Sequence, residues 1–388
     1  MQPGTAVVVG GGIGGLAAAL GLCRTGWRVT VVERAPAALA DAGAGISLAA
    51  NGVRALDALG VGPALRTASR RQLSGGTRTP GGRLLARMDG HAVERALGAP
   101  LVGIPRAALH RLLRTALPDG ALLAGVEVTS VEDPADAPHA RVHTTAGMYE
   151  AGLVVAADGI NSPLRTRLLP DAPGPSYSGS TVLRAITAHP VPVTGDFQLT
   201  WGPGTEFGHM LLADGRAEWH AVVNAPPGLR HEDPLAAVRR RFARWHEPIP
   251  ALLAATAPEA VLHHDVYELA TPLPTYAVGR VALLGDAAHA MTPFLGQGAC
   301  QALEDAVTLA AAVAAAPDVR TGLVRYDAER RPRTQAVAVA ARRAGRMGQQ
   351  LSGPLAVAAR NALMRLAPSR LTIRTTLRHA AWTPPALA

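Results

Sequence analysis

The stretch TAVVVGGGIGG, residues 5–15, carries the most informative pattern in the sequence. The β-branched run Ala6 to Val9 predicts a buried strand, and Gly15 to Arg24 predicts a helix that ends near Gly26. Trp27 to Glu33 predicts a second strand. A strand–helix–strand unit of about 30 residues is the form that supports a dinucleotide site.

The glycines fit the spacing G-x-G-x-x-G between the predicted strand and helix. Gly10 permits a tight turn, Gly12 lets a pyrophosphate approach the helix N-terminus, and Gly15 allows close helix–strand packing. Glu33 ends the second strand, where a carboxylate accepts from ribose hydroxyls; an acid there favours FAD or NAD over NADP. The alternative is a glycine-rich turn without a ligand. The cofactor-binding residues predicted from this unit are Gly10, Gly12, Ile13, Gly14, Gly15, Glu33 and Arg34.

The rest of the chain alternates between two kinds of pattern. Buried strands are predicted at Leu153 to Ala157 and Val281 to Leu284, whereas Tyr177 to Val223 shows the short runs and glycine turns of antiparallel sheet. Further predictions are helices over 50–59, 107–117, 298–315 and 320–346, and a hairpin of 126–131 with 141–145.

We therefore expect an α/β protein in which a β-rich domain is inserted into a Rossmann-type domain. The Rossmann-type domain is expected to be discontinuous, over 1–72, 98–175 and 268–346. The inserted domain is expected over 73–97 and 176–267, followed by a C-terminal helical segment over 347–388.

Composition excludes several functions. The net charge is +9, yet every cation is arginine, so lysine-dependent chemistry such as a Schiff base or a P-loop is excluded. The arginines are scattered and aromatics are 4%, which argues against nucleic-acid binding. Two cysteines form no disulfide framework and indicate a reducing, cytoplasmic location. The apolar runs are broken by glycines or too short to span a membrane.

Two later motifs make the pattern specific. AADGINSPLR covers residues 156–165, and GDAAHAMTPFLGQG covers residues 285–298. With the glycine loop, they resemble class A FAD-dependent monooxygenases of the para-hydroxybenzoate hydroxylase fold, most closely the salicylate hydroxylase, urate hydroxylase and zeaxanthin epoxidase-like branch. The resemblance covers nearly the whole chain, including residues 104–109, 179–184 and 326–331.

The resemblance implies roles for residues around a non-covalent FAD. Asp286 would accept from ribityl hydroxyls, and Pro293 would fix backbone beside the flavin ring. Asp158 would serve the pyrophosphate region and NAD(P)H use, and the alternative is that it only caps a strand-to-turn junction. Arg106 would reach the flavin phosphate, and the alternative is a solvated arginine before a helix. The remaining residues assigned to FAD by resemblance are Val128, Gly296, Gly298, Ala299 and Cys300.

Four residues have a competing structural explanation. Cys300 stands where the family usually has Asn, so it either tunes the flavin or packs, and we favour packing. His289 is expected to pack in its turn rather than act as a base. His263 and His264 point to opposite faces of a strand, so no metal site is predicted.

The implied function is NAD(P)H-consuming monooxygenation. NADH or NADPH would reduce FAD, O2 would form a flavin C4a-hydroperoxide, and a small aromatic or polycyclic/isoprenoid substrate would be hydroxylated or epoxidised. Arg184 and His209 are the catalytic candidates, while Trp201, Phe207 and Trp219 are expected in the pocket wall or core. We expect a monomer or homodimer. The alternatives are a flavin-dependent reductase or dehydrogenase of related fold, and a non-enzymatic flavin-binding module.

Overall fold

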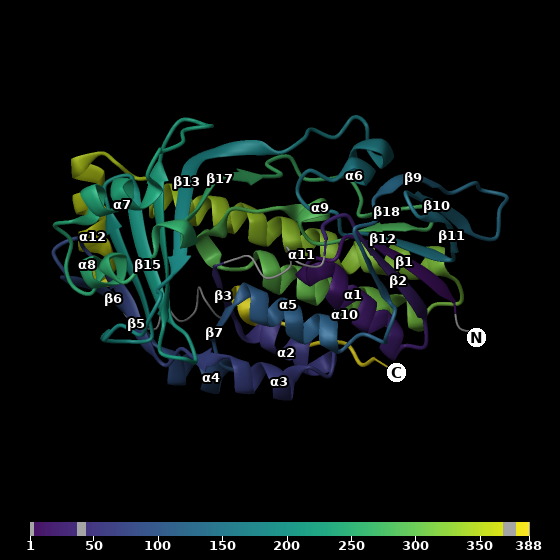
Figure 1. Cartoon of the computed structure of the whole chain (residues 1–388), viewed down its shortest axis with the longest axis horizontal. Helices are drawn as coiled ribbons and strands as arrows, with labels where there is room; N and C mark the ends of the chain where they lie inside the picture. The colour runs from purple at the N-terminus through teal and green to yellow at the C-terminus, as the bar shows by residue number, and fades with distance from the viewer. Residues whose placement is uncertain (1–3, 37–43, 368–377, 388) are drawn as a thin grey trace.

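A parallel sheet forms the centre of one half of the molecule (Figure 1). The computed structural model describes residues 4–36, 44–367 and 378–387. In the sheet, β1 lies between β2 and β12, and every pairing is parallel except that of β18 with β19. Its strands, in spatial order, are β18 (Ala277–Val278), β19 (Val281–Leu283), β12 (Leu153–Ala156), β1 (Thr5–Val9), β2 (Arg28–Glu33) and β8 (Leu122–Ala124).

Helices with small residues on their contact faces pack against this sheet. α1 (Ile13–Arg24) approaches α10 (Gly298–Ala314) so closely that a Cβ on Gly21 would lie 3.0 Å from the Ala310 Cβ. α2 (Ala50–Ala58) contacts α10 on another side, where Gly52 lies against Cys300. Small side chains at these positions let the three helix backbones come together and form one apolar core with the sheet.

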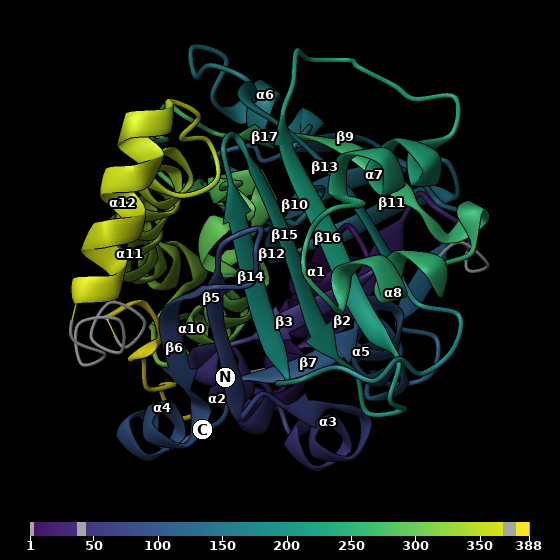
Figure 2. The same cartoon turned by 90° about the vertical axis from the view of Figure 1, so that its left-hand side faces the viewer.

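A seven-stranded sheet forms the other half. Its outer face is covered by α7 (Pro234–Phe242) and α8 (Ile249–Ala254) (Figure 2). Phe207 and Trp219 are buried in the apolar core beneath these helices. Its strands, in spatial order, are β17 (Leu262–Glu268), β13 (Ser176–Ile186), β16 (Ala217–Asn224), β15 (Thr205–Leu211), β14 (Phe197–Gly202), β5 (Ser74–Arg78) and β6 (Leu84–Asp89).

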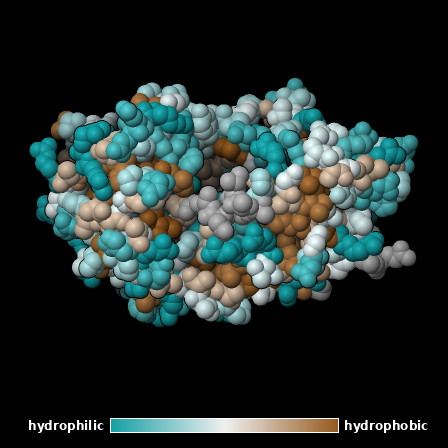
Figure 3. Space-filling model, in the orientation of Figure 1, coloured by the Kyte–Doolittle hydropathy of each residue, from teal (hydrophilic) through white to brown (hydrophobic). Residues whose placement is uncertain are grey.

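The opposite face of this sheet, here called the inner face, points toward the parallel-sheet half. A Cβ on Gly45 of β3 would lie 2.7 Å from the Glu218 Cβ of β16, which shows how closely the halves meet. Between the two halves, the face shown in Figure 3 is hollowed near its middle. The strands come from the segments predicted to form the inserted domain, but the division into domains remains a proposal.

Smaller elements complete the chain. The predicted hairpin corresponds to β9 (Val128–Glu132) and β10 (Ala140–Thr144), and β11 (Gly147–Ala151) adds a third strand that was not predicted. No helix in the described ranges is long and apolar enough to cross a membrane. The other elements are β3 (Gly45–Leu48), β4 (Arg70–Arg71), β7 (Val102–Pro105), α3 (Gly62–Ala68), α4 (Gly90–Leu97), α5 (Arg106–Thr115), α6 (Pro163–Leu168), η2 (Pro258–Ala260), α9 (Asp286–His289), η3 (Pro293–Leu295), α11 (Val319–Met347) and α12 (Pro354–Leu366).

A buried ionic network ties α11 to α10. Arg330 is fully buried; its Nε lies 2.7 Å from Asp305 Oδ1, and its Nη1 donates to Glu304. Arg333 also donates to Glu304, from Nε at 2.6 Å. Charges taken out of water are stable only when they are paired and hydrogen-bonded, and these meet both conditions.

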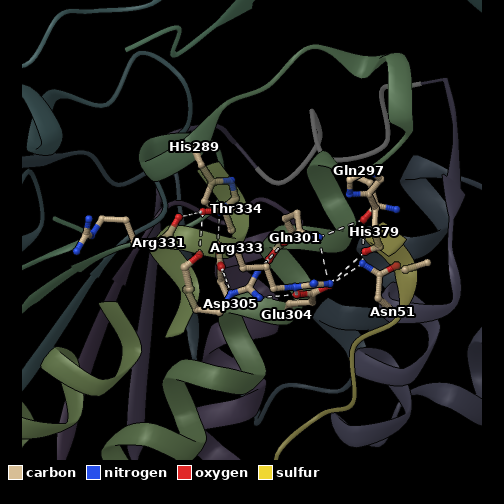
Figure 4. Close-up of polar contacts among 12 residues, drawn as sticks. Asn51, His289, Gln297, Gln301, Glu304, Asp305, Arg331, Arg333, Thr334 and His379 are labelled. Atoms are coloured by element: carbon tan, nitrogen blue, oxygen red, sulfur yellow. Dashed lines mark hydrogen bonds and ion pairs between the residues drawn. The ribbon is translucent and has the colours of Figure 1, made fainter. Parts of the chain in front are cut away.

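The same carboxylates connect two further elements (Figure 4). Asn51 on α2 donates from Nδ2 to Glu304 Oε1 at 2.7 Å. On the other side, Asp305 Oδ2 lies 2.5 Å from His289 Nε2 on α9 and accepts from the Gly285 N–H at 3.0 Å. The network therefore fixes α2, α9, α10 and α11 relative to one another.

Replacement of Arg330 by Met should destabilise the protein by about 3–5 kcal/mol, because two buried carboxylates lose their main counter-charge. The measurement is denaturant unfolding followed by circular dichroism. Arg331→Met is the control, since Arg331 pairs with Asp327 where a third of its side chain is exposed and should change stability by about 0–1 kcal/mol. Equal losses in the two variants would contradict the assigned role of Arg330.

The network should also make the stability of the fold depend on pH in the acidic range. Burial by itself raises the pKa of Asp305, but the positive charges of His289 and Arg330 outweigh it and lower that pKa to about 2. A lowered carboxyl pKa stabilises the fold above the ordinary value of 3.8, and that stabilisation is lost as the pH falls toward 2.

The wild-type protein should therefore have a larger free energy of unfolding than Asp305→Asn at neutral pH. The pH-dependent part of this difference, about 2 kcal/mol, should be lost as the pH falls from 4 to 2. Unfolding midpoints of both proteins across this range provide the measurement. A stability difference that does not change with pH would show that Asp305 is not ionised with a lowered pKa.

Candidate active site

The glycine loop has the geometry that the sequence predicted. Gly10 has a φ of +105°, and a Cβ there would lie 2.3 Å from the Ala157 carbonyl oxygen. A Cβ on Gly15 would lie 2.0 Å from the Gly10 carbonyl oxygen. Only glycine fits at these two positions. At Gly12, by contrast, a Cβ would meet no atom of residues 4–36, 44–367 or 378–387 within 4 Å, so these residues leave the space before α1 open to a ligand.

The N-terminus of α1 is free to hold an anion. Its N-cap is Gly12, which provides no side-chain cap, and the first turn contains no acid. Gly14 in that turn packs closely on Leu284. The unpaired N–H groups and the helix dipole together suit a pyrophosphate.

Glu33 lies at the end of β2 beside this loop. Its Oε2 accepts from the Gly11 N–H at 2.6 Å, and its Oε1 accepts from the Ala35 N–H at 2.7 Å. Both oxygens keep a lone pair that a ribose hydroxyl can use. Arg34 is exposed, 3.8 Å from Glu127, and Val128 opens the neighbouring strand β9.

His110 is a residue that the sequence analysis missed. It lies on α5 with only 9% of its surface exposed, and its Nε2 is 2.7 Å from the Gly11 carbonyl. The contact holds the glycine loop from the side opposite Glu33. The signal was faint: His110 lies one helical turn after Arg106, on the buried side of the helix.

The second motif lies directly against the first. A Cβ on Gly10 would be 3.2 Å from the Asp158 Cα. Asp158 Oδ2 accepts from the Leu164 N–H at 3.3 Å, while its buried Oδ1 has no hydrogen-bond partner among the described residues. Burial raises the Asp158 pKa. Arg165 donates to the Ile160 carbonyl at 2.7 Å and to the Ala287 carbonyl at 3.2 Å, which joins the second motif to the third.

Asp286 begins α9 and is exposed within an otherwise buried run from 281 to 290. Desolvation by the surrounding protein raises its pKa, and the positive charges of His289 and Arg106 oppose that rise. Arg106 is exposed at the first position of α5, and its N–H donates to the Ala44 carbonyl at 3.0 Å. The structure thus brings Asp286 and Arg106, which are 180 positions apart, into one electrostatic environment.

The turn after α9 leads to a second open helix N-terminus. Pro293 begins the short helix η3, and Gly296 follows in the left-handed region at φ +61°. A Cβ at Gly296 or Gly298 would meet nothing within 4 Å, and α10 starts there without a side-chain cap. Ala299 lies in its first turn. These N–H groups can hold a partial negative charge on a ring.

Cys300 and His289 are both buried away from this space. The Cys300 side chain packs against Gly52 on α2, and burial raises its thiol pKa to about 12. Packing is therefore the role that the structure supports, and only the backbone of Cys300 is left for a cofactor. His289 lies against Asp305, in keeping with the expected packing role.

Arg184 lies on the inner face of the large sheet. In the strand register, Arg184 on β13 lies opposite His220 on β16, and His220 lies opposite Gly208 on β15. The Arg184 Nε is buried without a hydrogen-bond partner among the described residues. Burial lowers the Arg184 pKa, Glu218 opposes this effect and Arg106 adds to it. Arg184 is thus within electrostatic reach of Arg106.

The assignment of His209 as a catalytic residue is corrected by the structure. Side chains alternate along a strand, and His209 follows the inner-face position Gly208, so it points to the outer face. It is 1% exposed and lies beside Trp219 in the register, and burial lowers its pKa to about 3. Phe207 and Trp219 belong to the core beneath α7 and α8.

The inner face carries instead three residues that the sequence analysis did not select, Glu206, His220 and Glu218. Their alternation along β15 and β16 was visible in the sequence, but which face pointed inward was not.

Comparisons with known proteins agree with this geometry. The family described as FAD binding domain matches residues 4–341. Aurachin C monooxygenase/isomerase of Stigmatella aurantiaca is 35% identical over 382 residues, 98% of each chain. The 3-amino-4-hydroxybenzoate 2-monooxygenase of Streptomyces cremeus is 38% identical over 361 residues, 89% of this chain and 87% of its own.

Solved structures give the same result. HpxO of Klebsiella pneumoniae, complexed with FAD and uric acid, superposes with a TM-score of 0.91 at 28% identity, covering 99% of this chain and 98% of its own. A salicylate hydroxylase substrate complex gives a TM-score of 0.74 at 26% identity, with complete coverage of both chains. The predicted para-hydroxybenzoate hydroxylase-like fold and the FAD cofactor are confirmed. The chain belongs to the FAD binding domain family and is an FAD-dependent monooxygenase with NAD(P)H as co-substrate.

Proposed function

We propose that this monooxygenase hydroxylates a small planar ring compound held between the flavin and the inner face of the seven-stranded sheet. The observation that carries the proposal is Arg184, whose buried Nε finds no partner within the described part of the chain and whose charge acts on the same region as Arg106. A buried donor without a partner is costly, and a substrate oxygen would satisfy it.

The names of relatives narrow the substrate class. By their names, three relatives act on 3-amino-4-hydroxybenzoate, act on urate and make a 4(1H)-quinolone. Each name describes a planar compound that carries nitrogen and oxygen, and we propose the same class here rather than an isoprenoid. Arginine suits such a site because its planar guanidinium stays charged and donates to ring oxygens.

The site residues divide the work of holding FAD. The N-terminus of α1 is proposed to bind the pyrophosphate, Glu33 the adenosine ribose, and Asp286 the ribityl chain, while the N-terminus of α10 faces the pyrimidine edge. The observation that supports this is the open space at Gly12 and Gly298 together with the exposed Asp286. When bound, the flavin supplies hydride acceptance and oxygen activation, and the protein binds, orients and excludes water.

We place the reaction in the cytoplasm, because it consumes NAD(P)H and because both cysteines of the chain are free.

The function is tested by screening planar ring compounds for acceleration of NAD(P)H oxidation by the FAD-loaded protein. Products are read by mass spectrometry for the gain of one oxygen atom. Acceleration with oxygenated product supports the proposal. A reductase would give reduced product without added oxygen, and a non-enzymatic module would show no acceleration; either result would overturn it.

Asp286→Ala should lose FAD while the fold is retained. A charged acceptor of hydrogen bonds contributes about 1.5–3 kcal/mol, which corresponds to roughly one to two decades in affinity. FAD affinity is measured by flavin fluorescence, with Asp119→Ala, an exposed surface carboxylate, as the control. Wild-type affinity in Asp286→Ala would remove Asp286 from the cofactor site.

Arg184→Met should keep FAD but raise the substrate KM or uncouple NAD(P)H oxidation from oxygenation, with release of hydrogen peroxide. The physical reason is that the charge which orients the substrate is gone while the cofactor contacts on other elements remain. Product and peroxide formed per NAD(P)H consumed are measured together. Arg141→Met, at an exposed position of β10, serves as control, and wild-type KM and coupling in Arg184→Met would exclude Arg184 from the site.

A further inference from the structure

A histidine is clamped between two carboxylates on the inner face. His220 Nδ1 lies 3.5 Å from Glu218 Oε2, and its Nε2 lies 3.6 Å from Glu206 Oε1. Glu206 and Glu218 are almost fully buried, whereas a quarter of the His220 side chain remains exposed. The cluster therefore borders open space instead of lying within a sealed core.

The backbone is adapted to this arrangement. A Cβ on Gly208 would lie 2.2 Å from His220 Nε2, so the imidazole occupies the space that any other residue at position 208 would fill. The ring thereby reaches across β15 to Glu206, which is held in turn by the Trp201 Nε1–H. Glu206 is thus fixed from two sides.

The histidine is held as a cation. Burial by itself lowers the His220 pKa, but the charges and hydrogen bonds of Glu218 and Glu206 outweigh it and raise that pKa to about 10. With one imidazolium between two carboxylates, the cluster keeps one net negative charge. Arg184, the neighbour of His220 across the strands, carries the balancing positive charge, and Glu218 acts on its pKa.

Two unlike groups are left for a ligand. The Arg184 Nε–H is a buried donor that no described residue pairs with. Glu218 uses Oε2 toward His220, which leaves Oε1 as a charged acceptor. A donor and a charged acceptor on the same face of the sheet are complementary to a ring that offers an oxygen and an N–H group.

We propose, on the basis of the function proposed above, that Arg184 and Glu218 select aromatic rings that carry both an oxygen acceptor and an N–H donor. Arg184 donates to the ring oxygen and Glu218 accepts from the ring N–H. His220 and Glu206 are positioning residues, because they neutralise and orient Glu218 without touching the ligand.

The test compares two bicyclic probes of the same outline, 4(1H)-quinolone and chromone, in which a ring oxygen replaces the N–H. Dissociation constants are measured with the FAD-loaded protein by the change in flavin absorbance and by calorimetry. Wild-type protein should bind the quinolone about 10–100-fold more tightly, the worth of one hydrogen bond to a charged group.

Glu218→Gln should reduce this preference to within about threefold. The cationic His220 would hold the amide oxygen of the glutamine, so that its N–H groups would meet the ring N–H donor to donor. Chromone affinity should be unchanged. Glu150→Gln, an exposed residue on β11, is the matched control and should retain the wild-type preference. A full preference retained in Glu218→Gln would overturn the assignment of Glu218.

His220→Gln separates positioning from mere structural support. It should weaken quinolone binding about 10-fold and leave chromone binding unchanged, because only the orientation of Glu218 is lost. Equal weakening of both probes would overturn the positioning role.

Failure of this inference is distinguishable from failure of the proposed function. Equal affinity of the wild-type protein for both probes, or no measurable binding of the quinolone, would overturn the selection of N–H-bearing rings. The proposed function would still stand if other ring compounds accelerated NAD(P)H oxidation with gain of oxygen.

Discussion

The buried pairing of Arg330 with Glu304 and Asp305 is the constraint on which the rest of the structure depends. One guanidinium links α11 to α10, and the two carboxylates extend the link to Asn51 on α2 and His289 on α9. Because buried charges tolerate little displacement, the network fixes the turn that presents Asp286 and the helix N-terminus at Gly298. A buried cluster thus holds in place the two elements that are proposed to bind the flavin.

Close backbone packing fixes the glycine loop and the second motif relative to each other. Gly10 lies against Ala157 and Asp158, while Glu33 and His110 hold Gly11 from two directions. Arg165 then ties the second motif to the Ala287 carbonyl in the third. Three motifs spread over nearly 300 residues therefore converge through backbone contacts and one arginine, and a single substitution in any of them affects a shared surface.

The substrate half follows a different rule, the alternation of side chains along strands. The outer face of the large sheet carries the apolar core under α7 and α8, and His209 is buried on the same face. The inner face has Arg184, His220 and Glu218 at neighbouring positions. The protein thus combines a rigid cofactor frame with a charged wall whose composition can change without disturbing that frame.

The sequence by itself determined the cofactor half, because the glycine spacing, the strand-end acid Glu33 and the motif around Asp286 are local patterns with local causes. The helices and strands that it predicted lie within a few residues of the observed ones, whereas other elements, such as α7, α8 and β11, were not predicted. Only the tertiary structure decided the substrate half. Whether Gly208 or His209 lies on the inner face depends on which side of the sheet α7 and α8 cover, and a shift of one residue reverses it. The enclosed thiol of Cys300, the contact of His110 and the clamp around His220 likewise arise from residues distant in sequence, whose meeting no local pattern encodes.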